Sequence, residues 1–147
     1  GHNLDDMAQS VLMNLQKGEI DRSVRLAPHT HSPIEGVIPR IVPLRWIPEQ
    51  EIHAHAVSAG LPIHHGECPH APGAMRQQSR AVVASMEAST PGARHGLLHS
   101  LDHIRKLHWI ANPDSKHEVN ECLECGEITS KEVCQSCTMR KWISEAT

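Results

Sequence analysis

The chain has 147 residues and a mass of 16.3 kDa, the size of one modest domain or of part of a larger protein. Its 39% hydrophobic and 21% charged residues are typical of a globular chain and exclude wholesale disorder. No apolar run approaches the roughly 18 residues of a membrane helix and no secretory leader is visible, so we expect a cytoplasmic protein without membrane association. The net charge of -3 and the lack of Phe and Tyr exclude a strongly basic nucleic-acid binder that stacks bases mainly on aromatic rings.

The first segment predicts a helix. Apolar side chains recur between Met7 and Leu15 with the 3.6-residue period of one helix face. Asn3 is suited to the N-cap, acidic residues follow in the first turn, and Gly18 suits the helix end. A buried strand normally precedes such a helix in an α/β unit and none stands before this one, so we expect the chain to lack an N-terminal part.

Helical periodicity returns further along the chain, and prolines and glycines separate the helical segments. Two prolines interrupt an apolar stretch over 37–44, so a strand there would be short or at a sheet edge. The other expected elements are a loop over 19–36, a helix from Pro48 to Gly60, a brief strand over 61–65, a helix over 75–86 and a helix after Thr90 that reaches 108. We therefore expect a first domain over 1–108, a linker over 109–117 and a C-terminal module over 118–147.

Four of the five cysteines form two CxxC pairs, Cys122 with Cys125 and Cys134 with Cys137. Each pair can present two thiolates from a tight turn, and together they provide the tetrahedral thiolate shell that Zn²⁺ favours. A closed shell leaves no position for a substrate, so we expect a structural zinc site that stabilises a segment with few apolar residues. The alternatives are an iron ion with the same ligands and two redox-active dithiols. The odd number of cysteines favours a reducing compartment.

Two further features could carry chemistry. The adjacent Asp5 and Asp6 could bind Mg²⁺, orient a water molecule or accept a proton, although acidic residues in a first helical turn also simply complement the helix dipole. Cys68 follows a predicted strand within Gly-Glu-Cys-Pro, where open α/β sheets place ligand-binding loops. Taken alone, a single cysteine is more often a small buried hydrophobic residue.

Four segments, in one order, resemble the archaeal and eukaryotic cytosolic tRNA 2-thiolation proteins, a branch of the PP-loop ATPases. They are GHNLDDMAQSVLMNL at 1–15, VIPRIVPLRWIPEQEI at 37–52, GECP at 66–69 and the two CxxC pairs. The resemblance covers nearly the whole chain, whereas GHNxDD alone would indicate only PP-loop proteins in general. It implies an α/β fold, the C-terminal part of a Rossmann-like PP-loop domain, followed by a four-cysteine zinc finger.

The resemblance also implies a reaction. In that family, ATP with Mg²⁺ adenylates the 2-oxygen of a tRNA uridine, and sulfur then replaces the activated oxygen. By resemblance, Asp5 and Asp6 are the acidic pair of the active site, with Asp6 as the principal catalytic residue. Gly1, His2 and Asn3 correspond to the strand-end turn beside the nucleotide.

Cys68 corresponds to the third cysteine ligand of a 4Fe–4S cluster, in which one iron stays open for sulfur. Arg76 and Arg80, on the helix after this loop, would face tRNA. The family's phosphate-binding S-G-G-x-D-S loop and the CxxC pair that would complete the cluster are not in the sequence. We therefore expect both to lie upstream, and we expect this chain alone to be inactive.

The expected function is that of an ATP-dependent tRNA uridine 2-sulfurtransferase. The wobble uridine is the preferred target, because the segment over 38–51 is most similar to that branch of the family. The expected partners are tRNA, a ubiquitin-like sulfur carrier protein or sulfide as the sulfur donor, and a second copy of the chain in a homodimer. The alternatives are a T-loop uridine or cytosine thiolase of the same superfamily, and a non-catalytic, zinc-stabilised tRNA-binding scaffold.

Overall fold

The structure is a computed structural model of the chain, and it describes residues 2–26, 40–64, 66, 69, 73–112, 120–129 and 131–145. These residues divide into two compact units. The first holds the described residues up to Ala111, and the second holds those from Asn112 onward. Within the described ranges, no helix combines the length and the apolar character that crossing a membrane requires.

The first helix, α1 (Leu4–Gln16), confirms the helix that the sequence predicts at this end of the chain. The side chain of Asn3 accepts a hydrogen bond from the N–H of Asp6 (2.8 Å), and the Asp6 carboxylate accepts one from the N–H of Asn3 (3.3 Å). This reciprocal capping box satisfies backbone donors that have no partner within the helix. Gly18 follows the helix with a φ of +70°, which suits a helix end.

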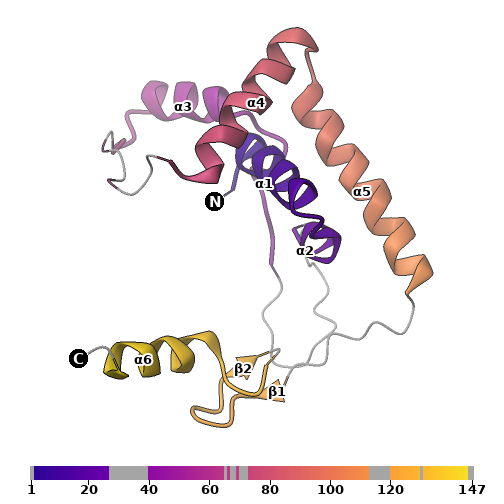
Figure 1. Cartoon of the computed structure of the whole chain (residues 1–147). Helices are drawn as coiled ribbons and strands as arrows, with labels where there is room; N and C mark the ends of the chain where they lie inside the picture. Colours follow the sequence, from indigo (N-terminus) through magenta and orange to yellow (C-terminus); the bar gives the residue numbers. More distant parts are fainter. Residues whose placement is uncertain are drawn as a thin grey trace. The chain divides into compact units, whose positions relative to one another are not determined.

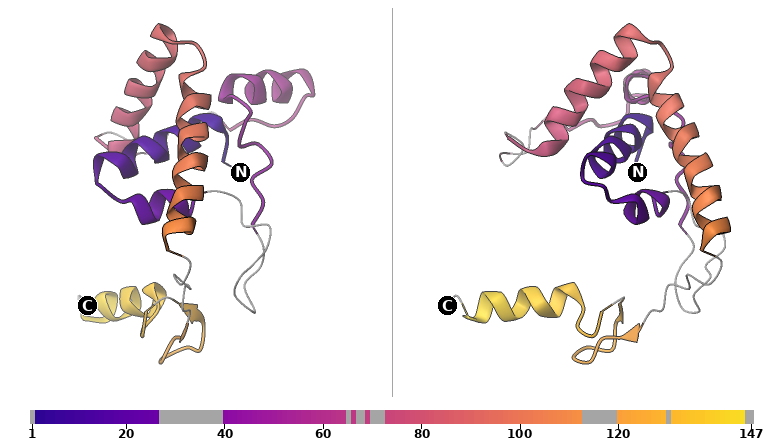
Figure 2. Two further views of the ribbon diagram at one scale, coloured as in Figure 1. Left: turned by 90° about the vertical axis from the view of Figure 1, so that its right-hand side faces the viewer. Right: turned by 45° about the vertical axis from the view of Figure 1, so that its right-hand side comes forward.

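The described residues of the first unit form four more helices: α2 (Ile20–Val24), α3 (Glu49–Ser58), α4 (Met75–Ser89) and α5 (Ala93–Ala111). α4 and α5 form a V-shaped helical hairpin, and α1 lies in its opening, in contact with both arms (Figures 1 and 2). At the apex of the hairpin, the Glu87 carboxylate accepts hydrogen bonds from the N–H groups of Gly92 and Arg94, each at 2.9 Å. Glu87 on α4 therefore caps the start of α5.

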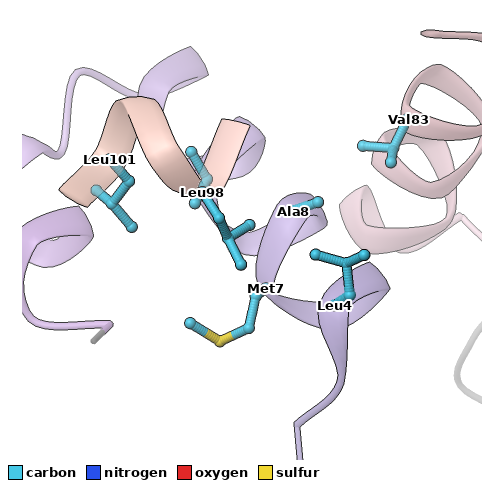
Figure 3. Packing of buried hydrophobic residues seen from close by; sticks show 7 residues of the cluster. Leu4, Met7, Ala8, Val83, Leu98 and Leu101 are labelled. Atoms are coloured by element: carbon cyan, nitrogen blue, oxygen red, sulfur yellow. The ribbon is translucent and has the colours of Figure 1, made fainter. Parts of the chain in front are cut away.

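The core of this unit is aliphatic. Figure 3 shows side chains of α1 placed between Val83 of α4 and the leucines of α5. The most deeply buried large side chains are Leu4, Leu98 and Leu101, which are at most 1% exposed. Burial of one such side chain contributes about 1.5–3 kcal/mol, so these helices can pack together without Phe or Tyr. The core thereby fixes the N-terminus of α1 against both arms of the hairpin.

The prediction of a loop over the whole of 19–36 is wrong, because α2 lies within it. Five residues without a side-chain cap give too weak a local signal to predict a helix. Packing against α1 and α5 stabilises α2 instead, with Ser23 and Val24 buried. The last predicted helix also ends later than expected, since α5 continues to Ala111.

Apart from a single bridge residue at Arg40, no strand forms over 40–44 or 61–64, the described parts of the two predicted strands. The chain turns at Pro43 instead, where the N–H of Arg45 donates to the carbonyl of Val42 (3.2 Å). The N–H of Leu61 donates to the carbonyl of Ala56 (2.9 Å), so the end of α3 uses a donor that a strand would need. The described part of the first unit is therefore helical, and the sheet of an α/β domain is not among these residues.

The second unit contains a short antiparallel pair and one helix. β1 (Asn120–Glu121) pairs with β2 (Ile128–Thr129), and α6 (Gln135–Glu145) follows. Gly126 has a φ of +73° in the turn between the strands, a conformation that favours glycine. The core of this unit consists of three buried cysteines, Cys122, Cys134 and Cys137, with Val133 packed against them.

Candidate active site and four-cysteine metal site

The acidic pair lies in the first turn of α1, and its two carboxylates have different surroundings. Asp6 takes part in the capping box and is 35% exposed, with one oxygen 3.6 Å from the Arg76 guanidinium. Arg76 also donates to the side chains of Gln9 (3.3 Å) and Ser10 (3.2 Å) on the same helix. The contact with Asp6 is longer than a hydrogen bond, so the Asp6 carboxylate keeps an accessible oxygen.

Asp5 is more enclosed, at 17% exposed, and each of its oxygens has a close donor. The Arg94 guanidinium donates to one oxygen (2.8 Å), and the backbone N–H of Glu49 donates to the other (2.7 Å). The second bond caps the first turn of α3 from a distant part of the sequence. Asp5 therefore joins α1 to both α3 and α5.

Arg94 and Glu87 extend this network. The Arg94 Nε lies 3.4 Å from a Glu87 oxygen. The pKa of Glu87 is lowered to about 2, chiefly because the N–H groups of Arg94 and Gly92 donate to its carboxylate. Burial disfavours the charge on Arg94, but the bonds to Asp5 and Glu87 outweigh it and raise the pKa of Arg94 above its ordinary value.

A cavity of about 660 Å³ adjoins this network. Its charged lining comes from Asp5, Glu49, Glu87, Arg80 and Arg94. These charges pair with one another, including Arg80 with Glu49 at 2.9 Å. The cavity thus presents three carboxylates, the two guanidinium groups that pair with them, and small apolar side chains.

The structure places the other predicted site residues as follows. Asn3 is the cap of α1, and His2 lines a separate cavity of about 140 Å³ beside Met7 and Arg40. Gly1 and Cys68 lie outside the described residues. The role of Cys68 as a cluster ligand therefore stays a prediction.

Sequence reasoning missed Arg94 and Glu49 as partners of Asp5. No local pattern marks either residue, because they lie 89 and 44 positions away along the chain. Their only sequence signals are a basic residue early in one helix and an acidic residue early in another, and both are common on solvated surfaces. Only the packing of the helices brings them to Asp5.

The four C-terminal cysteines converge as their spacing predicts. The sulfur atoms of Cys122, Cys125, Cys134 and Cys137 all lie within 4.8 Å of one another, with 3.6 Å between Cys125 and Cys134. An ion bound tetrahedrally at about 2.3 Å holds four sulfurs about 3.8 Å apart, so the observed spacing fits a single ion. Backbone N–H groups also donate to the sulfurs of Cys122 (3.2 Å) and Cys134 (3.4 Å), as expected around thiolates.

The thiols influence one another strongly. The pKa of Cys122 is lowered to about 6, chiefly because the N–H groups of Cys134 and Glu124 point at its sulfur. The pKa of Cys137 is raised to about 12 by the neighbouring sulfurs of Cys134 and Cys125. Four thiolates in this space repel one another, and a cation between them removes that penalty. The donor set therefore fits a metal ion with a preference for sulfur, such as zinc or iron.

Comparison with known proteins shows what the chain is similar to. tRNA 2-thiolation protein NcsA of Haloferax volcanii is 32% identical in an alignment of 149 positions. The alignment covers 95% of this chain and 46% of that protein. Cytoplasmic tRNA 2-thiolation protein 1 of Danio rerio is 35% identical over 140 residues, which cover 95% of this chain and 40% of that protein. Over nearly its whole length, the chain is similar to part of these tRNA 2-thiolation proteins. This confirms the resemblance seen in the sequence motifs.

A solved structure supports the same relationship to the tRNA 2-thiolation proteins. The U34-tRNA thiolase NcsA from Methanococcus maripaludis, determined with its [4Fe-4S] cluster, matches 96% of this chain and 43% of that chain. The TM-score is 0.73 at 28% sequence identity. No protein-family model matches the chain. The chain spans less than half the length of these tRNA 2-thiolation relatives.

Proposed function

We propose that the chain forms the C-terminal part of an ATP-dependent tRNA uridine 2-sulfurtransferase that acts on the wobble uridine. The observation that carries this proposal is the match over 95% of the chain to proteins named for tRNA 2-thiolation. The similar structure is named a U34-tRNA thiolase, which favours the wobble position. In this proposal, residues 1–108 belong to a Rossmann-like PP-loop domain and 118–147 to a zinc module, and α5 continues from the first of these into the proposed linker over 109–117 as far as Ala111.

The proposed reaction has two steps. The uridine 2-oxygen attacks the α-phosphorus of ATP, pyrophosphate leaves, and the proton on N3 of the uridine passes to a base. Hydrosulfide then adds to C2, AMP departs with the former 2-oxygen, and the hydrosulfide proton is returned to N3. An AMP ester is a much better leaving group than a carbonyl oxygen, which is why activation must come first. We assign the proton transfer or the orientation of ATP-bound Mg²⁺ to Asp6, because it is the more accessible carboxylate of the pair.

Four other residues have proposed roles beside the nucleotide or the sulfur. Gly1, His2 and Asn3 precede α1 in the sequence, and we assign them to contact with ATP. Cys68 is assigned as a thiolate ligand of a 4Fe–4S cluster, which supplies an open iron for sulfur when bound. Support comes from the Gly-Glu-Cys-Pro motif and from the cluster in the similar structure. A ubiquitin-like thiocarboxylate protein or free sulfide would provide the sulfur.

The four-cysteine site is proposed to hold structural zinc. Its sulfurs lie as close together as one tetrahedral ion requires. A four-iron cluster gives each thiolate a separate iron and therefore needs the thiolates further apart. The zinc module carries basic side chains, of which Lys141 pairs with Glu124. We also propose that this module contacts the tRNA backbone, and that Arg76 and Arg80 of α4 face the tRNA.

Two alternatives share the same observations. A T-loop uridine or cytosine thiolase would use the same residues on another nucleotide. A non-catalytic, zinc-stabilised tRNA-binding scaffold would need the zinc module but not Asp6 or Cys68. A homodimer and a cytoplasmic location are further proposals, and the word cytoplasmic in the names of several relatives supports the latter.

A genetic experiment tests the function directly. The gene that encodes this chain is deleted in its own cells, and 2-thiouridine is mapped in tRNA by mass spectrometry. We expect wobble 2-thiouridine to disappear and to return when the wild-type gene is restored. Asp6→Asn and Cys68→Ser should fail to restore it, whereas the matched exposed substitution Gln16→Ala, at the far end of α1, should restore it. Unchanged 2-thiouridine in the deletion strain overturns the proposal, a loss confined to the T-loop identifies the first alternative, and restoration by both site variants identifies the scaffold.

A further inference from the structure

We propose that the two aspartates have different tasks: Arg94 is a positioning residue that fixes Asp5, Asp5 holds the start of α3, and only Asp6 takes part in the reaction. This inference rests on the proposed function for its catalytic part. The structural part, that Arg94 and Asp5 act as one unit, stands on the geometry alone.

The two carboxylates differ in the hydrogen-bond donors that their oxygens already have. Both Asp5 oxygens have donors at 2.7–2.8 Å, one from a guanidinium and one from a backbone N–H. Charge-assisted bonds of this length are among the strong ones in proteins. Among the residues that the structure describes, the Asp6 carboxylate has only the 3.3 Å capping bond and the 3.6 Å approach of Arg76, and twice the exposure of Asp5. A reacting group needs an available oxygen, and Asp6 offers one.

The position of α3 depends on its N-terminal end. None of its ten residues, all of which the structure describes, is buried. Its attachment runs through its N-terminal end, where the N–H of Leu4 donates to the carbonyl of Ile47 (3.0 Å) and the N–H of Glu49 donates to Asp5 (2.7 Å). These two bonds run in opposite directions between the same two segments. Asp5 therefore fixes the start of α3 directly beside the first turn of α1.

The planar guanidinium of Arg94 faces two carboxylates. Its Nη1 binds Asp5 and its Nε faces Glu87, which also caps α5 through the N–H groups of Gly92 and Arg94. The guanidinium thus connects the N-terminus of α5 with the carboxylate that caps α3. A lysine carries the same charge but has no planar fork to reach both carboxylates. The network orients the first turn of α1, on which Asp6 lies, with respect to three other helices.

The proposal makes a non-additive prediction that a general loss of stability would not produce. The restored strain carries Arg94→Met, Asp5→Asn, their combination, or Asp6→Asn, and the initial rate of wobble thiolation is measured. Asp6→Asn should lower the rate by about 100-fold or more, the usual scale for a proton-transfer group. Asp5→Asn should lower it by less, because the amide oxygen still accepts the Glu49 N–H. In the Asp5→Asn background, Arg94→Met should lower the rate no further. Arg94→Lys should lower the rate as much as Arg94→Met does.

Urea unfolding of the purified full-length chain gives a readout independent of thiolation. The Arg94→Met and Asp5→Asn shifts of the unfolding midpoint should be clearly less than additive in the double variant. Additive shifts overturn the inference, as does a loss of thiolation in Asp5→Asn equal to that in Asp6→Asn. If the wild-type gene fails to restore thiolation, the proposed function falls instead, and the unfolding cycle alone decides whether Arg94 holds Asp5.

Discussion

The buried pair between Arg45 and Asp102 allows a quantitative prediction. Arg45 precedes the segment that meets the first turn of α1, and its guanidinium donates to both oxygens of Asp102 on α5, at 2.7 and 3.0 Å. The Arg45 side chain is 8% exposed and that of Asp102 is 26% exposed. Arg45→Met keeps most of the apolar stem but removes the fork. We expect this substitution to destabilise the first unit and to loosen the segment that leads to Glu49.

The magnitude follows from burial. Removal of one partner of a buried pair costs about 3–5 kcal/mol, because the other charge is left without compensation. In Arg45→Met the remaining charge is Asp102, which water reaches, so we expect about 2–3 kcal/mol from this term. The guanidinium also lies 4.6 Å from the centre of the Trp46 ring. This cation–π contact adds at most about 1 kcal/mol, for a total of about 3 kcal/mol.

The reverse substitution should cost more. Asp102→Ala leaves the more deeply buried charge, and the Arg45 Nε is buried without a hydrogen-bond partner among the described residues. We therefore expect Asp102→Ala to exceed Arg45→Met, at about 3–5 kcal/mol. The double variant Arg45→Met with Asp102→Leu should recover part of the loss, since an apolar pair leaves no buried charge.

Urea unfolding followed by far-ultraviolet circular dichroism measures these differences in the full-length chain. His103→Ala, on the next position of α5, is the matched control because His103 is exposed. A cost below about 0.5 kcal/mol for Arg45→Met would refute the reasoning, because that is the range of ordinary surface substitutions. A smaller cost for Asp102→Ala than for Arg45→Met would refute the argument from burial.

Two further predictions concern pH and metal. Because the pKa of Glu87 is lowered from 4.5 to about 2 in the folded chain, its carboxylate contributes stability above pH 4.5 that is lost as the pH falls toward 2. Glu87→Gln should therefore show a shallower decline of the unfolding midpoint between pH 4.5 and 2 than the wild type, and equal declines would contradict this. At the four-cysteine site, we expect one zinc ion per chain by elemental analysis, and Cys137→Ser should lose it while Ser136→Ala, the preceding residue, retains it. Retention of the full zinc content by Cys137→Ser would show that the site does not use all four sulfurs.

Local chemistry explains which predictions from the sequence succeed. The start of α1 depends on Asn3 and on an acidic residue three positions later, and both are visible in the sequence. The convergence of the cysteines depends on two short CxxC turns, so their spacing alone brings each pair together. α2 could not be predicted in this way, because five residues form a stable helix only through contacts with α1 and α5.

The resemblance to the tRNA 2-thiolation proteins, the start of α1 and the cysteine site were determined by the sequence itself, since each rests on residues close together along the chain. The separate environments of Asp5 and Asp6 were decided by tertiary structure. Neighbours in sequence project in different directions from a helix, and the packing of α3 and α5 then supplies donors to one carboxylate and not to the other. The partners of Asp5 and Arg45 lie 44 to 89 residues away, and pairs at such separations form only after the aliphatic core has fixed the helices.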